Sequence, residues 1–171
     1  MVEHRQGPET ARLRLRALTR EDAEDFYALN SHPQVLRHTG EPPLESLEAA
    51  RIAIETYPDW ARYGFGRWAC ELKETQRVIG FCGLKRLPEL NEVDLGFRFL
   101  PEHWGKGLAT EASLATLKFG REVLQLERII ALVLPQNTAS VRVLEKVGLH
   151  FEREVEYFDE PCHLWADQPQ R

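Results

Sequence analysis

The feature that most constrains this sequence is a strand, a glycine-rich turn and a helix that follow one another between residues 92 and 123. Side chains alternate along the strand, with Val93, Leu95, Phe97 and Phe99 on one side and Glu92, Asp94, Gly96 and Arg98 on the other. The helix, from Leu108 to about Val123, places Leu108, Ala112, Ala115 and Phe119 on one face. The segment therefore predicts a half-buried strand that leads through a tight turn onto a packed helix.

The turn between this strand and helix has the composition of an anion-binding cradle. Gly105 and Gly107 allow successive N–H groups to point inward, and the helix adds its own unpaired N–H groups and the positive end of its dipole. A Rossmann turn would need glycine where Thr110 stands, and a Walker turn would need Ser or Thr at Gly107. We therefore predict a phosphate or diphosphate site, the alternative being a tight connection that binds nothing.

The remaining patterns predict one mixed α+β domain around a single sheet. We expect further strands at residues 12–18, 67–72, 77–85, 129–134, 151–158 and 162–165, with a hairpin over 73–76. We expect further helices at residues 21–30, 44–63 and 138–147, and Pro58 should break or kink the second of them. A loose leader over residues 1–9 and a frayed tail over 167–171 leave a domain of residues 10–166.

Composition and charge exclude several classes of protein. The chain has 22 Lys and Arg against 27 Asp and Glu, a formal charge of −5, so we expect no direct binding of nucleic acid. No stretch is apolar for long enough to span a membrane, and residues 1–7 lack the apolar core of a signal peptide. Cys70, Cys82 and Cys162 are too few for a disulfide framework, and no CxxC or HxxxH pair is present. We therefore expect a cytoplasmic protein with reduced thiols and no metal site.

The turn is similar to the acetyl-CoA pyrophosphate loop of the GNAT N-acetyltransferase superfamily. The run is Trp104-Gly105-Lys106-Gly107-Leu108-Ala109-Thr110-Glu111-Ala112, and Gly107 and Ala109 match the last two fixed positions of the family pattern Arg/Gln-x-x-Gly-x-Gly/Ala. Trp104 stands where the family usually has Arg or Gln. This Trp-Gly-Lys-Gly run resembles the ribosomal-protein N-terminal acetyltransferase subgroup.

Two further segments carry the same resemblance. Residues 137–149 (Asn-Thr-Ala-Ser-Val-Arg-Val-Leu-Glu-Lys-Val-Gly-Leu) are similar to the subgroup's Asn-x-x-Ser-x-x-Val-Leu-Glu-Lys-x-Gly-Phe. Residues 10–16 resemble its opening strand, so the likeness extends from Thr10 to Trp165. It implies a single GNAT-like domain with a twisted, mostly antiparallel central sheet flanked by helices. In that fold the central strands splay apart around the pantetheine arm of the cofactor.

The resemblance also implies which residues hold acetyl-CoA. The backbone of Phe97 to Phe99 would pair with the arm as an added strand does. Gly96 would start the splay through a bulge or a close backbone approach, or be only a weak point in the sheet. Asn137 would reach the arm, cap its helix, or do both. The implied cofactor-binding residues are Phe97, Arg98, Phe99, Trp104, Gly105, Lys106, Gly107, Leu108, Ala109, Thr110, Asn137 and Ser140.

The implied reaction is acyl transfer from acetyl-CoA to a primary amine by direct attack in a ternary complex. Glu92 and Asp94 share one strand face, and neighbouring carboxylates raise one another's pKa, so either could be the base. The alternative is that both are solvated and a water chain removes the proton. Leu144 stands where many family members have a Tyr acid, while Ser140, one helical turn earlier, resembles the subgroup's hydroxyl near the sulfur or is a plain first-turn hydroxyl. The candidate catalytic residues are Glu92, Asp94 and Ser140.

The acceptor and other partners are less constrained. The subgroup resemblance implies the N-terminal amine of a protein, such as a ribosomal protein, and polyamines, antibiotics and small metabolites are open as well. Dimers are frequent among similar proteins, so a homodimer is also open. Because the Tyr acid is absent, a CoA-binding sensor or scaffold without turnover is the alternative to an enzyme. A nucleotide-binding protein that uses the same cradle is a third hypothesis.

Overall fold

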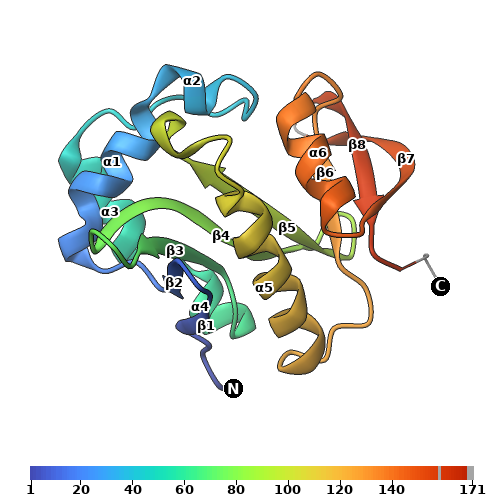
Figure 1. Cartoon of the computed structure of the whole chain (residues 1–171), viewed down its shortest axis with the longest axis horizontal. Coiled ribbons are helices and arrows are strands. Elements are labelled where there is room, and N and C mark those ends of the chain that lie inside the picture. The colour runs from blue at the N-terminus through green and yellow to red at the C-terminus, as the bar shows by residue number, and fades with distance from the viewer. Residues whose placement is uncertain (158, 169–171) are drawn as a thin grey trace.

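In the described part of the chain, eight strands form one sheet with helices against both of its faces (Figure 1). This computed structural model describes residues 1–157 and 159–168. The strands are β1 (Gln6–Glu9), β2 (Leu13–Arg16), β3 (Arg67–Leu72), β4 (Arg77–Leu87), β5 (Glu92–Phe99), β6 (Ile130–Val133), β7 (His150–Tyr157) and β8 (Glu160–Ala166). Their order in the sheet is β1-β2-β3-β4-β5-β6-β8-β7. All neighbours are antiparallel except β5 and β6, which confirms the mixed α+β fold.

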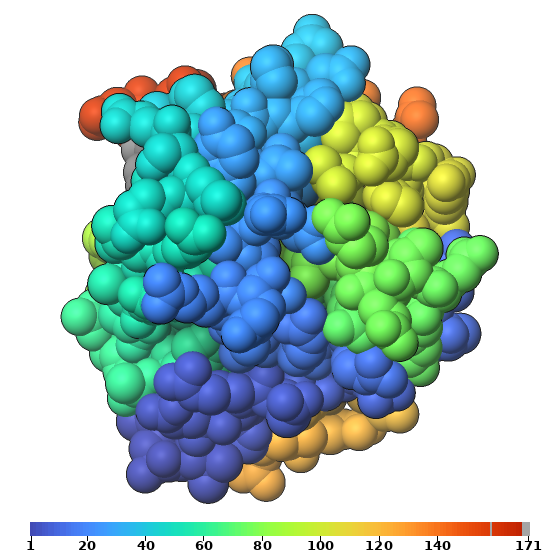
Figure 2. Space-filling model, turned by 90° about the vertical axis from the view of Figure 1, so that its left-hand side faces the viewer, coloured from blue at the N-terminus to red at the C-terminus, as the bar shows by residue number. Residues whose placement is uncertain are grey.

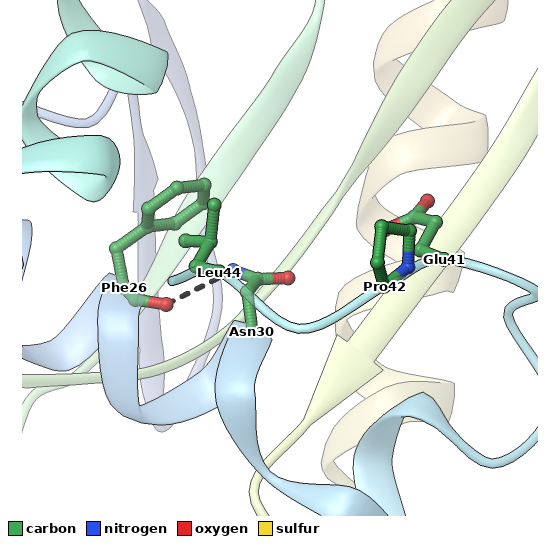
Figure 3. A pocket seen from close by; sticks show the side chains of 5 residues that line it. All are labelled: Phe26, Asn30, Glu41, Pro42 and Leu44. Carbon is green, nitrogen blue, oxygen red and sulfur yellow. Dashed lines mark hydrogen bonds between the residues drawn. The ribbon is translucent and has the colours of Figure 1, made fainter. Parts of the chain in front are cut away.

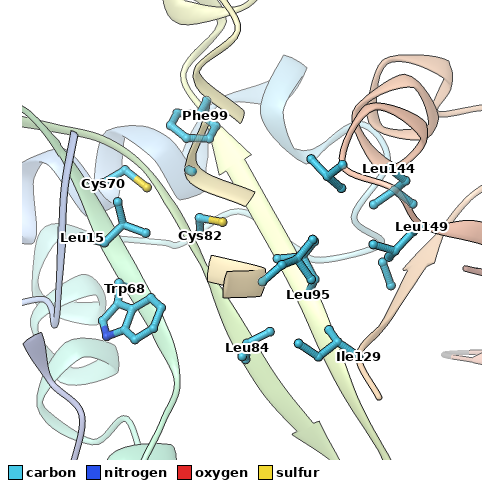
Figure 4. Close-up of a cluster of buried hydrophobic side chains, with 14 of the residues drawn as sticks. Leu15, Trp68, Cys70, Cys82, Leu84, Leu95, Phe99, Ile129, Leu144 and Leu149 are labelled. Atoms are coloured by element: carbon cyan, nitrogen blue, oxygen red, sulfur yellow. The ribbon is translucent and has the colours of Figure 1, made fainter. Parts of the chain in front are cut away.

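The helices lie on the two faces of the central strands. They are α1 (Ala23–Ser31), α2 (Pro33–Leu36), α3 (Leu47–Glu55), α4 (Asp59–Tyr63), α5 (Leu108–Glu122) and α6 (Thr138–Lys146), with 3-10 turns at Arg20–Asp22 and Pro101–His103. Cys82 of β4 and Leu95 of β5 are buried in the core cluster that includes the apolar residues of α5 (Figure 4). Phe81, the neighbour of Cys82, points the other way and packs with Leu29 of α1. Helices α1 and α5 therefore cover opposite faces of β4.

The predicted loose leader is wrong. Gln6–Glu9 form β1, which pairs with β2 at the edge of the sheet. The main-chain N–H of His4 donates to the Gly64 carbonyl at 2.7 Å, and the indole N–H of Trp68 donates to the His4 carbonyl at 2.8 Å. This short strand contains Gly7 and Pro8 and has no hydrophobic alternation, so no sequence pattern could reveal it.

Most of the other predicted elements are confirmed, with shifted ends. Pro58 separates α3 from α4, as expected. His32-Pro33 ends α1 as predicted, but Pro33 then begins α2, because the His32 ring accepts the Gln34 N–H and caps this short helix. The predicted end of the seventh strand at Phe158 lies outside the described residues.

The predicted frayed tail is wrong at its first residue. The Asp167 side chain is 2% exposed, accepts the Ile129 N–H at 2.7 Å and pairs with Arg121. Residues 169–171 of that tail lie outside the described part of the chain. None of the described helices has the length and apolar character needed to cross a membrane.

Strand β5 has two unlike edges. Toward β4 it is paired along its whole length, from Glu92↔Leu87 to Phe99↔Gly80, with no register shift. Toward β6, which runs parallel to it, Asp94↔Ile130 is the one pair among the described residues. The splay of the central strands is therefore confirmed, and no bulge at Gly96 starts it.

Candidate functional site

The turn after β5 presents main-chain N–H groups without partners. Gly105 and Gly107 have φ angles of +73° and +77°, in the left-handed region that favours glycine. Gly107 is the N-cap of α5, and the first N–H that bonds back into this helix is that of Glu111. Within residues 1–157 and 159–168, no protein group accepts the N–H groups of residues 105–110. The turn thus has free donors for a diphosphate, with the positive end of a 15-residue helix behind them.

The edge of β5 that faces β6 offers a second set of peptide groups. The Leu100 N–H donates to the Ile79 carbonyl at 2.9 Å, and in an antiparallel ladder such bonded pairs recur at every second residue. The peptide groups of Arg98 therefore face β4, while those of Leu95 and Phe97 face the gap between β5 and β6. The parallel pair Asp94↔Ile130 uses the Leu95 N–H, so the Leu95 carbonyl and the Phe97 peptide groups remain open. Of the residues predicted to pair with the arm, Phe97 is suitably placed and Arg98 is not.

Trp104 joins the turn to the end of β5. Its indole N–H donates to the Phe99 carbonyl at 2.7 Å, and the residue remains 49% exposed. The alternation turns this carbonyl toward the gap, so one acceptor on the open edge is already bound by the protein. The sequence predicted that the Phe99 backbone would pair with the cofactor arm. This is corrected for its carbonyl, which Trp104 already binds.

Asp94 lies where β5 and β6 begin to diverge. Its Oδ1 accepts the Leu132 N–H at 2.9 Å, and its Oδ2 accepts from Arg67 Nη2 at 3.0 Å. A side chain, not the β5 backbone, therefore receives this N–H of β6. Burial raises the pKa of Asp94 and Arg67 opposes this, with the net shift upward. Each oxygen keeps a further lone pair, so the carboxylate can still accept a proton.

Gly96 makes room for the Arg67 side chain. A Cβ at this position would lie 2.5 Å from Arg67 Nη2 and 2.7 Å from Arg67 Cζ. The guanidinium thus rests against β5 next to Asp94, and its Nε is buried without a partner in the described structure. Gly96 therefore serves the close approach of a side chain, which was not among the expectations for it.

Glu92, at the start of β5, is bound in an ion pair before the point where β5 and β6 separate. Its carboxylate oxygens accept from Arg128 Nε at 2.9 and 3.2 Å, and Arg128 also binds Glu152 of β7. The Glu92 residue is 7% exposed, so the alternative of a solvated carboxylate is wrong for it. This pair ties the start of β5 to the segment before β6. Of the two predicted bases, Asp94 is the one located where the strands separate.

Helix α6 carries the other predicted residues. Asn137 Oδ1 accepts the Ser140 N–H at 3.3 Å, which confirms that Asn137 caps the helix. The half-buried Ser140 hydroxyl has no hydrogen-bond partner among the described residues. Leu144 is 1% exposed and belongs to the hydrophobic core. The contacts of Asn137 and Ser140 with a cofactor stay predictions.

Arg98 belongs to the face of the sheet that carries α1. Its Nη1 donates to Asn30 Oδ1 at 2.5 Å and to Glu41 Oε2 at 3.1 Å, and its guanidinium lies over the Phe81 ring. A hollow of about 110 Å³ adjoins these groups (Figure 3) and is lined by Phe26, Asn30, Glu41, Pro42 and Leu44. The Arg98 side chain is thus held away from the turn.

A second hollow, of about 250 Å³, lies where α1, the β3–β4 turn and residues 100–103 meet (Figure 2). Its lining is Asp25, Thr75, Arg77, Val78, Ile79, Leu100, Glu102 and His103. Arg77 and Asp25 form an ion pair within it. Neither hollow includes the N–H groups of residues 105–110, so both are separate from the cradle.

Sequence reasoning missed three arginines that organise this site. Arg67 binds Asp94, Arg128 binds Glu92, and Arg12 donates to the Lys106 carbonyl of the turn at 2.9 Å. Only Arg12 had a signal, because it lies in the N-terminal segment that carried the resemblance. The other two come from segments with no motif.

Comparisons with known proteins agree with this geometry. The family model described as "Acetyltransferase (GNAT) domain" matches residues 12–150. An uncharacterized N-acetyltransferase of Bacillus subtilis (strain 168), YoaA, is 36% identical over 146 residues, which are 84% of this chain and 82% of YoaA. The spermidine N(1)-acetyltransferase of Escherichia coli (strain K12) is 28% identical over 153 residues, 86% of this chain and 78% of that enzyme. The crystal structure of an acetyltransferase from Agrobacterium tumefaciens str. C58 has a TM-score of 0.81 at 26% identity, covering 95% of this chain and 94% of that one.

Proposed function

This chain belongs to the GNAT family of acetyltransferases, and from that premise we propose that it transfers an acetyl group from acetyl-CoA to a primary amine in a ternary complex. One observation carries the proposal: the unpaired N–H groups of residues 105–110 and the open edge of β5 lie at the two ends of one short connection. Bound acetyl-CoA supplies the acetyl group as an activated thioester.

The turn and the strand edge hold different parts of the cofactor. The N–H groups of residues 105–110 donate to its diphosphate, whose charge the dipole of α5 favours. The Leu95 carbonyl and the Phe97 peptide groups pair with the amides of the pantetheine arm, as an added strand would. Asn137 uses its Oδ1 for the helix cap, which leaves its amide N–H groups for the same arm.

We assign the role of base to Asp94. The attacking amine must lose a proton, and a carboxylate whose pKa is raised by burial takes that proton more readily than an ordinary one. Arg67 orients Asp94 Oδ2 and stabilises the charged form. Glu92 is assigned to the ion pair with Arg128, so its part is structural.

Two further groups act on the charges that develop during transfer. The Phe97 N–H, on the open edge, donates to the carbonyl oxygen as negative charge builds on it. The Ser140 hydroxyl donates to the departing sulfur. Its lack of a protein partner in the described structure leaves it available for this contact.

The acceptor we propose is the α-amine of a peptide or protein, and the competing acceptor is a polyamine such as spermidine. Asp94 is paired with Arg67 and Glu41 with Arg98, so an arginine already offsets the charge of each carboxylate, which weakens its attraction for the further cationic nitrogens of a polyamine. The buried Nε of Arg67 lacks a partner, and the carbonyl groups of a peptide are acceptors for it.

The test is release of free thiol from acetyl-CoA with matched acceptors: short peptides with free N-termini, the same peptides with acetylated N-termini, and spermidine. We expect turnover with free peptides and none with the blocked ones. Turnover with spermidine alone would overturn the proposed acceptor. Tight binding of CoA without turnover on any amine would favour a sensor or scaffold, and absence of CoA binding would overturn the proposed function altogether.

A further inference from the structure

The turn between β1 and β2 contacts the cofactor turn from outside the site. Glu111, in the first turn of α5, accepts from Thr10 Oγ1 at 2.5 Å, from the Arg12 N–H at 3.0 Å and from Arg12 Nε at 2.9 Å. Burial alone would raise the pKa of Glu111, but these hydrogen bonds outweigh it and lower the pKa. The carboxylate is therefore held charged, with donors from one short segment.

The same arginine also fixes one peptide group of the cofactor turn. Arg12 Nη1 donates to the Lys106 carbonyl at 2.9 Å. In a planar trans peptide the carbonyl and the next N–H point in opposite directions. By holding the Lys106 carbonyl on its own side, Arg12 therefore directs the Gly107 N–H to the other side of the turn.

This contact matters because the peptide lies between two glycines. Gly105 and Gly107 both have positive φ, and without a Cβ they give this part of the backbone more freedom than any other residue would. The turn from β1 to β2 is itself anchored, since Lys73 donates to the carbonyls of Thr10 and Arg12. Arg12 thus connects the glycine-containing turn at residues 105–107 to the β1–β2 turn, which Lys73 holds in place.

We propose that Arg12 is a positioning residue for acetyl-CoA. Together with Thr10 and Glu111, it orders residues 105–107 before the diphosphate binds. The inference rests on the proposed function, because it concerns the same turn. Binding then avoids the cost of ordering these residues, which is otherwise subtracted from the affinity. The N-terminal segment is accordingly part of the cofactor site, because it sets the position of the turn.

The test compares three variants by calorimetric titration with CoA and by steady-state kinetics. Arg12→Ala is expected to raise the Kd for CoA and the KM for acetyl-CoA about tenfold, with a smaller change in kcat. Arg12→Lys should be nearly as impaired, because a single nitrogen does not reproduce the fork by which Arg12 reaches Glu111 through Nε and the Lys106 carbonyl through Nη1. Arg14→Ala is the matched control: Arg14 lies on the same hairpin, is 42% exposed against 45% for Arg12, and pairs with Glu9 and Glu71 instead.

A second measurement is independent of the cofactor. NMR order parameters of the backbone N–H groups of residues 105–107 in the free protein should be lower in Arg12→Ala than in wild type and unchanged in Arg14→Ala. If Arg12→Lys binds CoA like wild type, Arg12 acts by its charge and the positioning role is overturned. The same holds if Arg12→Ala and Arg14→Ala bind CoA equally well. If the wild-type protein itself does not bind CoA, it is the proposed function that fails.

Discussion

The two edges of β5 differ in almost every respect. The edge toward β4 is paired from Glu92 to Phe99, and Gly80 of β4 lets the two backbones lie close together. The edge toward β6 has one pair, Asp94↔Ile130, and its next contact runs from the Leu132 N–H to the Asp94 side chain. The same strand is therefore fully hydrogen-bonded along one edge and has unpaired peptide groups along the other.

This difference is what the proposed cofactor site requires of the sheet. Below Asp94, the ion pair of Glu92 with Arg128 keeps β5 and β6 together. Beyond this point the carboxylate of Asp94 takes the Leu132 N–H of β6, so the Leu95 carbonyl and the Phe97 peptide groups stay unpaired with β6. In the proposed function the paired edge holds β5 in place, and the unpaired edge binds the cofactor arm.

The strongest test of the open edge is Asp94→Asn against Asp94→Ala. The amide can still accept the Leu132 N–H but cannot take a proton, so we expect kcat to fall about 10²- to 10⁴-fold with little change in the Kd for CoA. Asp94→Ala loses both functions, so its Kd for CoA should rise as well. Thiol release and calorimetric titration measure the two quantities.

The pH profile provides the control for that experiment. Because burial raises the pKa of Asp94, the base form is lost as pH falls through a value above the ordinary 3.8, and wild-type kcat should fall there. The Asn variant should lack this acidic limb. Near-normal kcat in Asp94→Asn would mean that water, not Asp94, removes the proton.

On the paired edge, Gly80→Ala should have the next largest effect. A Cβ at Gly80 would overlap the Arg98 carbonyl oxygen and the Phe99 ring, so the two strands must move apart. We expect a loss of about 3 kcal/mol in the free energy of unfolding, measured by urea denaturation. Gly96→Ala is the matched control, because its Cβ meets the Arg67 side chain, which can move. This variant should lose less stability than Gly80→Ala but more of its activity. Equal losses of stability would contradict the contrast between the edges.

The order of strand, turn and helix was predictable, but the contacts that make the site were not. Alternation located β5, and the glycines located the cradle, because both signals lie in neighbouring residues. The bond from Leu132 to Asp94 joins positions 38 apart, and that from Arg128 to Glu92 joins positions 36 apart. Such pairs leave no periodic trace in a sequence, so the two carboxylates looked equivalent. Strand β1 was missed because its own residues do not alternate between apolar and polar. Only its pairing with Arg14 and Arg16 of β2 makes it a strand.

The ion pair below the gap can be tested with Glu92→Gln. This change leaves Arg128 with Glu152 and the Gln168 carbonyl as partners, and we expect about 2 kcal/mol lower stability to urea. The kcat should stay close to wild type, because Glu92 lies below the point where the strands separate. Glu156→Gln, at an exposed position of β7, should change neither quantity. A large loss of kcat with unchanged stability would return Glu92 to the role of base.

The smallest expected effect is that of Trp104→Phe, which removes the indole N–H and keeps an aromatic ring beside the turn. The bond to the Phe99 carbonyl is one hydrogen bond from a half-exposed side chain, so the Kd for CoA should rise by no more than about threefold. Trp104→Ala, which also removes the ring, should weaken binding further if the ring packs on the cofactor. Tighter binding by Trp104→Phe would be the informative contradiction. It would mean that the cofactor needs the Phe99 carbonyl and that Trp104 competes for the last acceptor of the open edge.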